Sequence, residues 1–183
     1  MVKKESIQYP ILKTKRLTII PLDEYNLRLL IEDWQKMESS LGVEMTGFKL
    51  EKEIAIAMKE CLQAVIDDSK NYLWCTNWVI ILKEENRIIG GACFKGKPDE
   101  WGNVEIGYGI NEEYRNKGYA TEAVNQLIRW ALIENNVQAI IAETDKDNIP
   151  SWRVLEKNGM KKFKETEKSI WWKLVKKGVK HDI

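Results

Sequence analysis

The chain has few of the residues that build metal sites and thiol-based catalytic centres. Among its 183 residues there are three cysteines and one histidine. Cys61, Cys75 and Cys93 are separated by 14 and 18 positions, and His181 stands near the C-terminus. A zinc site or a Cys–His nucleophilic pair would therefore lack ligands. We expect no metal cofactor, and we expect the cysteines to be inert core residues.

Long apolar stretches and an excess of one charge are also missing. No apolar run reaches the roughly 18 residues that a membrane-spanning helix needs, and residues 1–5 are charged rather than apolar. The formal net charge is only +1, which excludes a generally basic surface for nucleic acid. No internal repeat or low-complexity linker divides the chain. We therefore expect one cytoplasmic domain over residues 1–183 that binds neither nucleic acid nor membrane.

One local charge imbalance remains, because residues 161–180 contain eight lysines and two glutamates. Lysine on the exposed face of an edge strand prevents further strand pairing, and this is the interpretation we favour. The alternative is attraction of an anionic cofactor or an acidic partner.

The apolar periodicity predicts a mixed sheet with helices. We expect strands at 16–22, 72–83, 87–95, 102–110 and 137–142, and two further strands within 161–175. Helices are expected at 23–36 and 51–67, at about 120–132, and from about 149 to a stop at Asn158-Gly159. The helix at 51–67 should bury one face, made of Ile54, Met58, Cys61, Leu62 and Val65. Early hairpins and later strand–helix alternation indicate an α/β (α+β) fold.

The most informative segment, residues 114–123, reads YRNKGYATEA. A strand precedes it, and the following helix repeats apolar residues at helical spacing, at Ala120, Ala123, Val124, Leu127, Ile128, Ala131 and Leu132. A strand–turn–helix unit directs backbone N–H groups and the positive end of the helix dipole at the turn, which favours a bound phosphate. The pattern is R-x-x-G-x-A, from Arg115 through Gly118 to Ala120. It is neither a P-loop nor a dinucleotide fingerprint, because Tyr119 and Glu112 stand where those motifs need Ser or Thr and a third glycine.

A second segment completes a larger pattern. After the strand at 137–142 come Asn148, Pro150 and Ser151 at the start of a helix, and then EKNGM at 156–160. This order of strand, R-x-x-G-x-A turn, helix, strand and N-x-x-S helix resembles the GNAT superfamily of acyl-CoA N-acyltransferases. Within it, the chain is most similar to the branch of bacterial ribosomal-protein N-terminal acetyltransferases. The resemblance covers about residues 11–175.

The resemblance implies a single-domain fold with a mostly antiparallel sheet, helices on both faces, and fourth and fifth strands that splay apart. In this superfamily the pantetheine arm of acetyl-CoA enters that gap, so acetyl-CoA is the expected acetyl donor. The backbone of Ile110 would bind the pantetheine, Asn148 would contact it from the second helix, and Ser151 would lie near the thioester sulfur. The pyrophosphate would be wrapped by Arg115, Asn116, Lys117, Gly118, Tyr119, Ala120 and Thr121.

The implied reaction is direct attack of an amine on the acetyl thioester. Glu105, in the fourth strand, and Glu143, at the end of the fifth, are candidate general bases, acting directly or through water. Many members of the superfamily have a tyrosine acid seven residues after the asparagine, but this chain has Leu155 there. Ser151 is the replacement candidate.

The acceptor is not readable from these motifs. A protein N-terminal α-amine, a polyamine and an aminoglycoside all remain open, as do a non-catalytic acyl-CoA sensor and either a monomer or a homodimer. Trp152, Trp171 and Trp172 are expected in the core rather than in an acceptor wall. Acidic residues of the first two helices are expected on solvated faces rather than at a cationic acceptor, and these are Glu32, Asp33, Glu38, Glu51 and Glu53.

Overall fold

The computed structural model describes residues 10–48 and 50–178. Its strands form one sheet in the order β1-β2-β3-β4-β5-β6-β8-β7. All neighbouring strands are antiparallel except β5 and β6. The strands are β1 (Leu12–Lys13), β2 (Leu17–Pro21), β3 (Asn77–Leu82), β4 (Arg87–Phe94), β5 (Asn103–Ile110), β6 (Ala139–Asp145), β7 (Lys161–Glu165) and β8 (Ser169–Val175).

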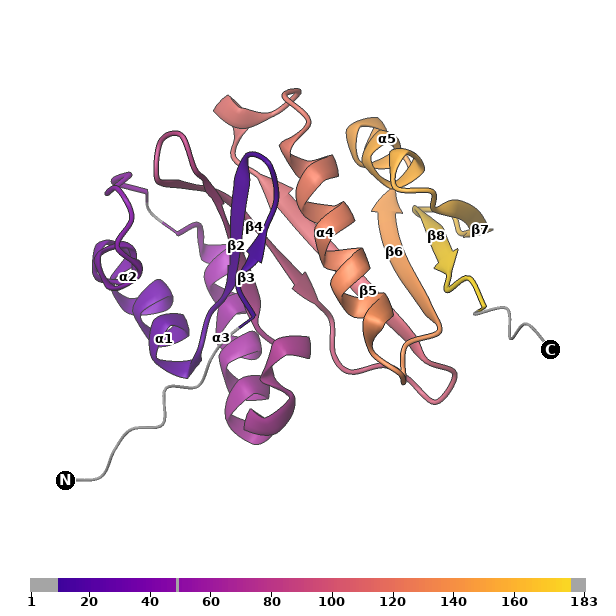
Figure 1. Ribbon diagram of the computed structural model, residues 1–183, viewed down its shortest axis with the longest axis horizontal. Helices are drawn as coiled ribbons and strands as arrows, with labels where there is room; N and C mark the ends of the chain where they lie inside the picture. The colour runs from indigo at the N-terminus through magenta and orange to yellow at the C-terminus, as the bar shows by residue number, and fades with distance from the viewer. Residues whose placement is uncertain (1–9, 49, 179–183) are drawn as a thin grey trace.

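Helices cover both faces of the sheet, as expected. They are α1 (Glu24–Glu32), α2 (Trp34–Leu41), α3 (Lys52–Asp67), α4 (Tyr119–Ile133) and α5 (Ile149–Lys157), with short 3₁₀ helices η1 (Ser69–Trp74) and η2 (Glu112–Tyr114). Figure 1 shows α1, α2 and α3 together at one end of the molecule and α5 at the other, with α4 between them.

The side-chain alternation of β3 explains the two layers. Trp78 and Ile80 point into the core beneath α4, whereas Val79 and Ile81 point into a second core beneath α1, α2 and α3. Successive side chains of a strand point to opposite faces, so β3, which is apolar from Trp78 to Leu82, has to be covered on both. In the carboxy-terminal half, β5, β6 and β8 contribute buried side chains to the core beneath α4.

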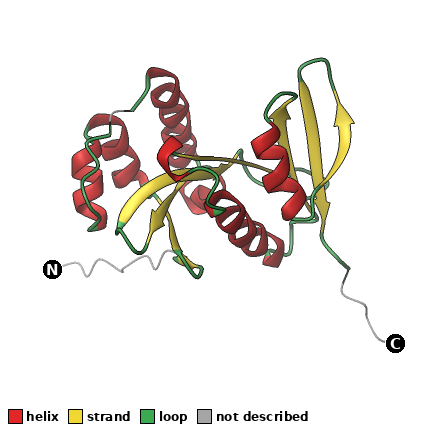
Figure 2. Ribbon diagram, turned by 90° about the horizontal axis from the view of Figure 1, so that it is seen from above, coloured by secondary structure: helices red, strands yellow, loops and turns green. Residues whose placement is uncertain are grey.

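The parallel pair β5–β6 is short, and this opens the sheet. β5 pairs with β6 only from Asn103 to Glu105, opposite Ala139 to Ile141, although β5 continues to Ile110 and β6 to Asp145. Beyond Glu105 the two strands diverge, and in Figure 2 the carboxy-terminal strands stand apart from the amino-terminal ones. The expected splay of the fourth and fifth strands is therefore confirmed. We call this opening the fork.

Two predicted elements were wrong. The single helix expected at 23–36 is two helices, because Asp33 leaves the helical region, with φ −155° and ψ 88°. Its carboxylate then caps α2 by accepting from the N–H of Lys36. The strand expected at 72–83 begins only at Asn77, because residues up to Trp74 form η1. The two-residue strand β1 was not expected.

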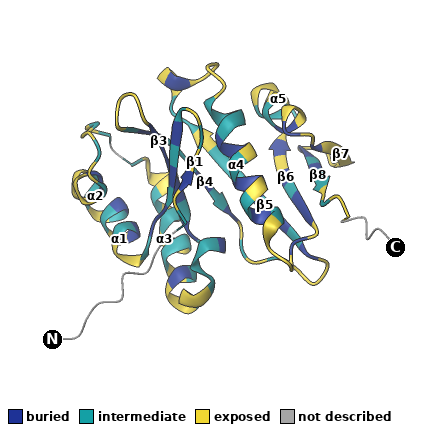
Figure 3. Ribbon diagram, viewed as in Figure 1, coloured by how far each residue is buried: buried dark blue, intermediate teal, exposed yellow. Residues whose placement is uncertain are grey.

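Three burial predictions also need correction or refinement. Ile54 was expected on the buried face of α3, but it is exposed. Glu38 was expected on a solvated face, but it is fully buried and accepts hydrogen bonds from the N–H and the hydroxyl of Thr46. Trp172 lies in the core as expected, whereas Trp152 and Trp171 are only partly buried. The lysine-rich β7 is the sheet edge and is exposed along its whole length (Figure 3).

Candidate active site

A tight loop connects the end of β5 to the start of α4. Arg115 donates from Nε to the carbonyl of Ile110 at 3.0 Å, which closes the loop over the end of the strand. Asn116 and Gly118 both adopt the left-handed region, with φ of 61° and 80°. Glycine takes that conformation without steric penalty, and asparagine takes it more readily than most residues. The loop therefore turns sharply enough to aim the first turn of α4 back toward β5.

The amino-terminal end of α4 is available to an anion. The N-cap Gly118 has no side chain with which to cap the helix. The first intrahelical bond there is from the N–H of Glu122 to the carbonyl of Gly118, so the N–H groups of the preceding first turn have no acceptor within the helix. Free N–H groups and the positive end of a helix dipole are the features that suit an anion.

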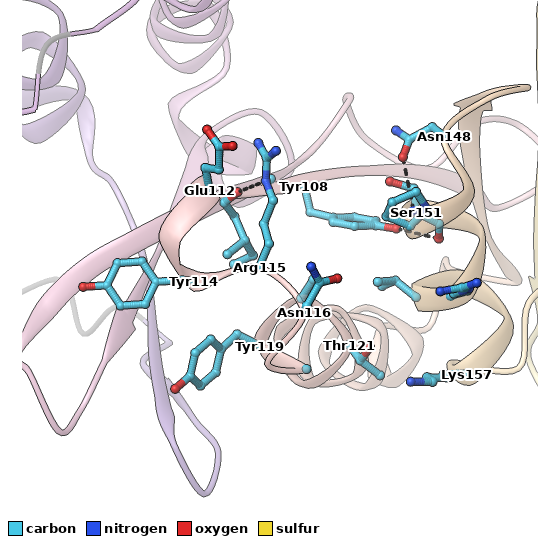
Figure 4. Close-up of a pocket in the computed structure, with 17 residues that line it drawn as sticks. Tyr108, Glu112, Tyr114, Arg115, Asn116, Tyr119, Thr121, Asn148, Ser151 and Lys157 are labelled. Atoms are coloured by element: carbon cyan, nitrogen blue, oxygen red, sulfur yellow. Dashed lines mark hydrogen bonds between the residues drawn. The ribbon is translucent and has the colours of Figure 1, made fainter.

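The facing wall of the site comes from α5 and from β5. Asn148 caps α5, since its side chain accepts from the N–H of Ser151 at 3.2 Å. Tyr108 reaches across from β5 and donates from its hydroxyl to the carbonyl of Ser151 at 3.2 Å. Burial raises the pKa of Tyr108 to about 12. Figure 4 shows Arg115 and Asn116 on one side of the pocket and Asn148 and Ser151 on the other, with Tyr108 between them.

These walls enclose a cavity of about 920 Å³, a size typical of sites for small molecules and cofactors. Nine of the residues expected at the cofactor line it, and these are Ile110, Arg115, Asn116, Gly118, Tyr119, Ala120, Thr121, Asn148 and Ser151. Lys117 does not line it, and its ammonium group lies over the ring of Tyr114, 5.3 Å from the ring centre. Tyr108, Arg153 and Lys157 also line the cavity, and sequence reasoning missed all three.

The turn that precedes α4 is held by Glu122 and Arg16. Its carboxylate accepts from the Thr14 hydroxyl at 2.6 Å, from the Arg16 N–H at 2.9 Å and from Arg16 Nε at 2.7 Å. Arg16 in turn donates from Nη1 to the carbonyl of Lys117 at 2.9 Å. Burial opposes ionisation of Glu122, but the hydrogen bonds from Thr14 and Arg16 outweigh it and lower its pKa.

Substitution Glu122→Gln should therefore destabilise the protein in a pH-dependent way. A carboxyl whose pKa is lower in the folded state adds stability above its unfolded pKa, about 4.3, and that stability is lost as the pH falls through the folded value. We expect the variant to lose about 1 to 2 kcal/mol of unfolding free energy at neutral pH. Urea unfolding of both proteins at neutral pH and at a pH below about 4 measures the difference, which should be smaller at the lower pH. An equal loss at both pH values would contradict the ionic role of Glu122.

The two candidate bases lie on the other face of the sheet and outside this cavity. Val104 and Ile106 of β5 point into the core beneath α4, so Glu105 between them points to the opposite face. Glu105 is the last residue of β5 that pairs with β6, and it forms an ion pair with Lys95. Glu143 follows two residues beyond Ile141, the partner of Glu105, and is exposed. The carboxylates therefore flank the base of the fork from the side opposite α4.

The other chemistry-bearing residues add little. All three cysteines are free, and burial raises the pKa of Cys61 to about 12. Within residues 10–48 and 50–178, no three His, Cys, Asp or Glu side chains are grouped as a metal site. His181 lies outside the described residues. Of the helices described, none has both the length and the apolar character needed to cross a membrane.

The sequence was compared with protein families and with known proteins. The sequence matches the family described as "Acetyltransferase (GNAT) domain" over residues 16–161. It is 45% identical over 83 residues to an uncharacterized N-acetyltransferase, YjdG, of Bacillus subtilis. That match covers 45% of this chain and 49% of YjdG, so the chain spans about half the length of that relative.

Solved structures share the fold. The ribosomal-protein-S5-alanine acetyltransferase of Vibrio fischeri superposes with a TM-score of 0.68 at 20% identity, over 91% of this chain and 96% of that chain. Spermidine N-acetyltransferase of Vibrio cholerae, solved with CoA and spermine, gives a TM-score of 0.61 at 13% identity, over 89% of this chain and 97% of that chain. The family match covers most of the sequence and includes the turn, the fork and both facing helices, and the chain therefore belongs to the GNAT acetyltransferase family.

Proposed function

We propose that the protein transfers the acetyl group of acetyl-CoA directly to a primary amine. One observation carries this proposal: an uncapped helix N-terminus and a sheet fork open onto the same cavity. The first suits a pyrophosphate, and the second leaves β5 beyond Glu105 without a strand partner on its β6 side, where an extended pantetheine arm could lie. Arg115, Asn148 and Ser151 would complete the binding site, and Lys157 adds a positive charge to its rim.

In this proposal the general base and the donor to the leaving sulfur lie on opposite faces of the sheet at the fork. The amine nitrogen forms a bond to the acetyl carbon, the carbon–sulfur bond breaks, and the CoA thiolate leaves with the electron pair. The proton lost by the attacking ammonium passes to Glu105, directly or through water, with Glu143 as the alternative base. Leu155 stands where many members of the superfamily have a tyrosine acid, and this buried side chain has no hydrogen-bond donor. The hydroxyl of Ser151 therefore takes that role and donates a hydrogen bond to the departing sulfur.

We favour a protein N-terminal α-amine as the acceptor. Deprotonation near pH 7 costs about 1.4 kcal/mol for an amine of pKa near 8, but about 4.6 kcal/mol for a lysine-type amine near 10.4. The α-amine thus demands less of the base. The neighbours themselves use both acceptor types by name, an S5 alanine and spermidine, and a shared fold does not choose between them.

The test is release of CoA thiol from acetyl-CoA against a panel of acceptors. Peptides with varied N-termini, polyamines, aminoglycosides and free amino acids cover the open classes. Thiol release with peptides and not with the small amines supports the proposal in full. Release only with a small amine overturns the α-amine, and binding of acetyl-CoA without any release favours an acyl-CoA sensor.

Ser151→Ala should lower kcat about tenfold, which corresponds to one hydrogen bond to a charged group of about 1.5 kcal/mol. The dissociation constant of CoA should stay within about twofold, since the capping N–H of residue 151 is retained. Steady-state kinetics with the active acceptor measures the first value and calorimetric titration the second. An unchanged kcat would exclude Ser151 as the donor to sulfur.

A further inference from the structure

An ammonium group already occupies the acceptor side of the fork. Lys95 directly follows β4, and its backbone N–H donates to the carbonyl of Glu105 at 2.9 Å. Its side chain turns back, so that Nζ pairs with Oε1 of the same Glu105. The Lys95 side chain is 52% exposed, whereas the Glu105 side chain is only 18% exposed. The carboxylate is thus fixed and sheltered on a strand, and its cation is carried by a flexible arm that reaches in from solvent.

The surrounding backbone leaves room for that arm. A Cβ atom on Gly107 would stand 3.9 Å from Cε of Lys95 and 3.6 Å from Sγ of Cys93. Both distances are ordinary van der Waals contacts, so the lysine chain lies beside Gly107, along β5 toward Glu105. Glu105 is also the residue at which the pairing of β5 with β6 stops. The Lys95 ammonium therefore lies at the closed end of the fork. It is next to Glu105, the residue expected to receive the acceptor's proton.

The local charge favours a cation there. Three neighbouring groups act on Lys95: Glu105 on β5, Glu143 on β6 and the thiol of Cys93 on β4. Burial alone would lower the pKa of Lys95, but the hydrogen bond to Glu105 and the charges of both glutamates raise it. Two carboxylates face one ammonium, so the position stays attractive to a second positive group.

We propose that Lys95 is a built-in competitor of the acceptor, and that the ammonium group of a protonated aliphatic amine displaces it from Glu105. Ion pairs with a mobile, half-exposed partner are weak, so Lys95 can swing into solvent at little cost. The sheltered Glu105 is then paired with the ammonium group of the acceptor instead of Lys95. It can take the proton that this ammonium group loses. Lys95 is a positioning residue in this scheme. It selects amines that arrive charged over aromatic amines that are neutral at the same pH.

The inference rests on the proposed function, but its first test needs no turnover. The probe is n-butylamine at neutral pH, titrated into the CoA-bound protein while the backbone amide NMR signals of residues 105 and 107 are followed. We expect saturable shifts in the wild type and about fivefold tighter binding in Lys95→Met, where the competitor is gone. Lys95→Arg should restore the weak binding, and Glu105→Gln should abolish the shifts.

Lys97→Met is the matched control. Lys97 stands two residues further along the chain, and its Nζ pairs with Oδ2 of Asp68 at 2.6 Å, away from the fork. This variant should bind butylammonium as the wild type does. Equal or weaker binding in Lys95→Met, or equal tightening in Lys97→Met, would overturn the proposal.

A kinetic arm separates this inference from the proposed function. With the acceptor found in the thiol-release panel, Lys95→Met should lower the KM of that acceptor about fivefold and leave the KM of acetyl-CoA unchanged. If no acceptor is acetylated but butylammonium binds as expected, the proposed function fails and the competition stands. If acetylation occurs and neither KM nor amine binding responds to Lys95→Met, only the competition fails.

Discussion

Substitution Gly118→Ala is expected to raise the dissociation constant of CoA by about 30- to 150-fold. Gly118 has φ +80°, where alanine is strained, and it supplies the cap of α4; an added Cβ would stand 3.5 Å from Nη2 of Arg16, so relief of the strain would move the N–H groups of the turn. Loss of one or two hydrogen bonds to charged phosphate oxygens costs about 2 to 3 kcal/mol, which corresponds to this range. Calorimetric titration of CoA into both proteins measures it.

The control for backbone strain is Gly42→Ala. Gly42 also has a positive φ, of 67°, and it ends α2 with no other group within 4 Å of the added Cβ. Both variants should lose about 1 kcal/mol of unfolding free energy, since alanine is strained in the left-handed region. Only Gly118→Ala should weaken CoA binding. Equal CoA affinity in the two variants would show that the turn does not contact the pyrophosphate.

Substitution Glu105→Gln should lower kcat about 100- to 1,000-fold at neutral pH, the range of effect that a positioned general base provides. The amide cannot take the acceptor's proton, whereas the site's shape is retained. The deficit should shrink as the pH is raised toward the pKa of the acceptor amine, because more acceptor then arrives already deprotonated. A pH–rate profile with the active acceptor measures both effects.

The matched variant is Glu143→Gln. Glu143 lies on the same face but is exposed, at the end of β6, so a loss of less than about threefold is expected. CoA affinity should be unchanged in both variants, because neither carboxylate lines the cavity proposed to bind it. If Glu143→Gln carries the large loss and Glu105→Gln does not, the assignment of the base is reversed.

Much of the fold followed from local patterns in the sequence. The helix after Gly118 was predictable because its apolar residues recur at helical spacing, and five of the seven named residues are buried in the structure. The predicted bounds of helices and strands were wrong where the same residue types suit two conformations. Tyr72 and Trp74 suit a strand, yet they belong to η1, and only packing in the folded protein decides this.

The site was predictable to the extent that its groups are consecutive in the chain. The turn from Arg115 to Thr121 carries its own signal, and so does the cap formed by Asn148. Tyr108 and Lys95 had no such signal, since they act through residues on other elements, Ser151 and Glu105. Contacts of that kind arise only when the sheet assembles and the fork opens.

Direct transfer of the acetyl group can be tested in a single turnover. Protein saturated with isotope-labelled acetyl-CoA is mixed with an excess of the acceptor that gives the fastest thiol release, and the label is followed by mass spectrometry. With direct transfer, every acetyl group lost from CoA should appear on the acceptor amine and none on the protein. Label on a protein side chain would contradict direct transfer, and label that stays on CoA with every acceptor would contradict the enzymatic function itself.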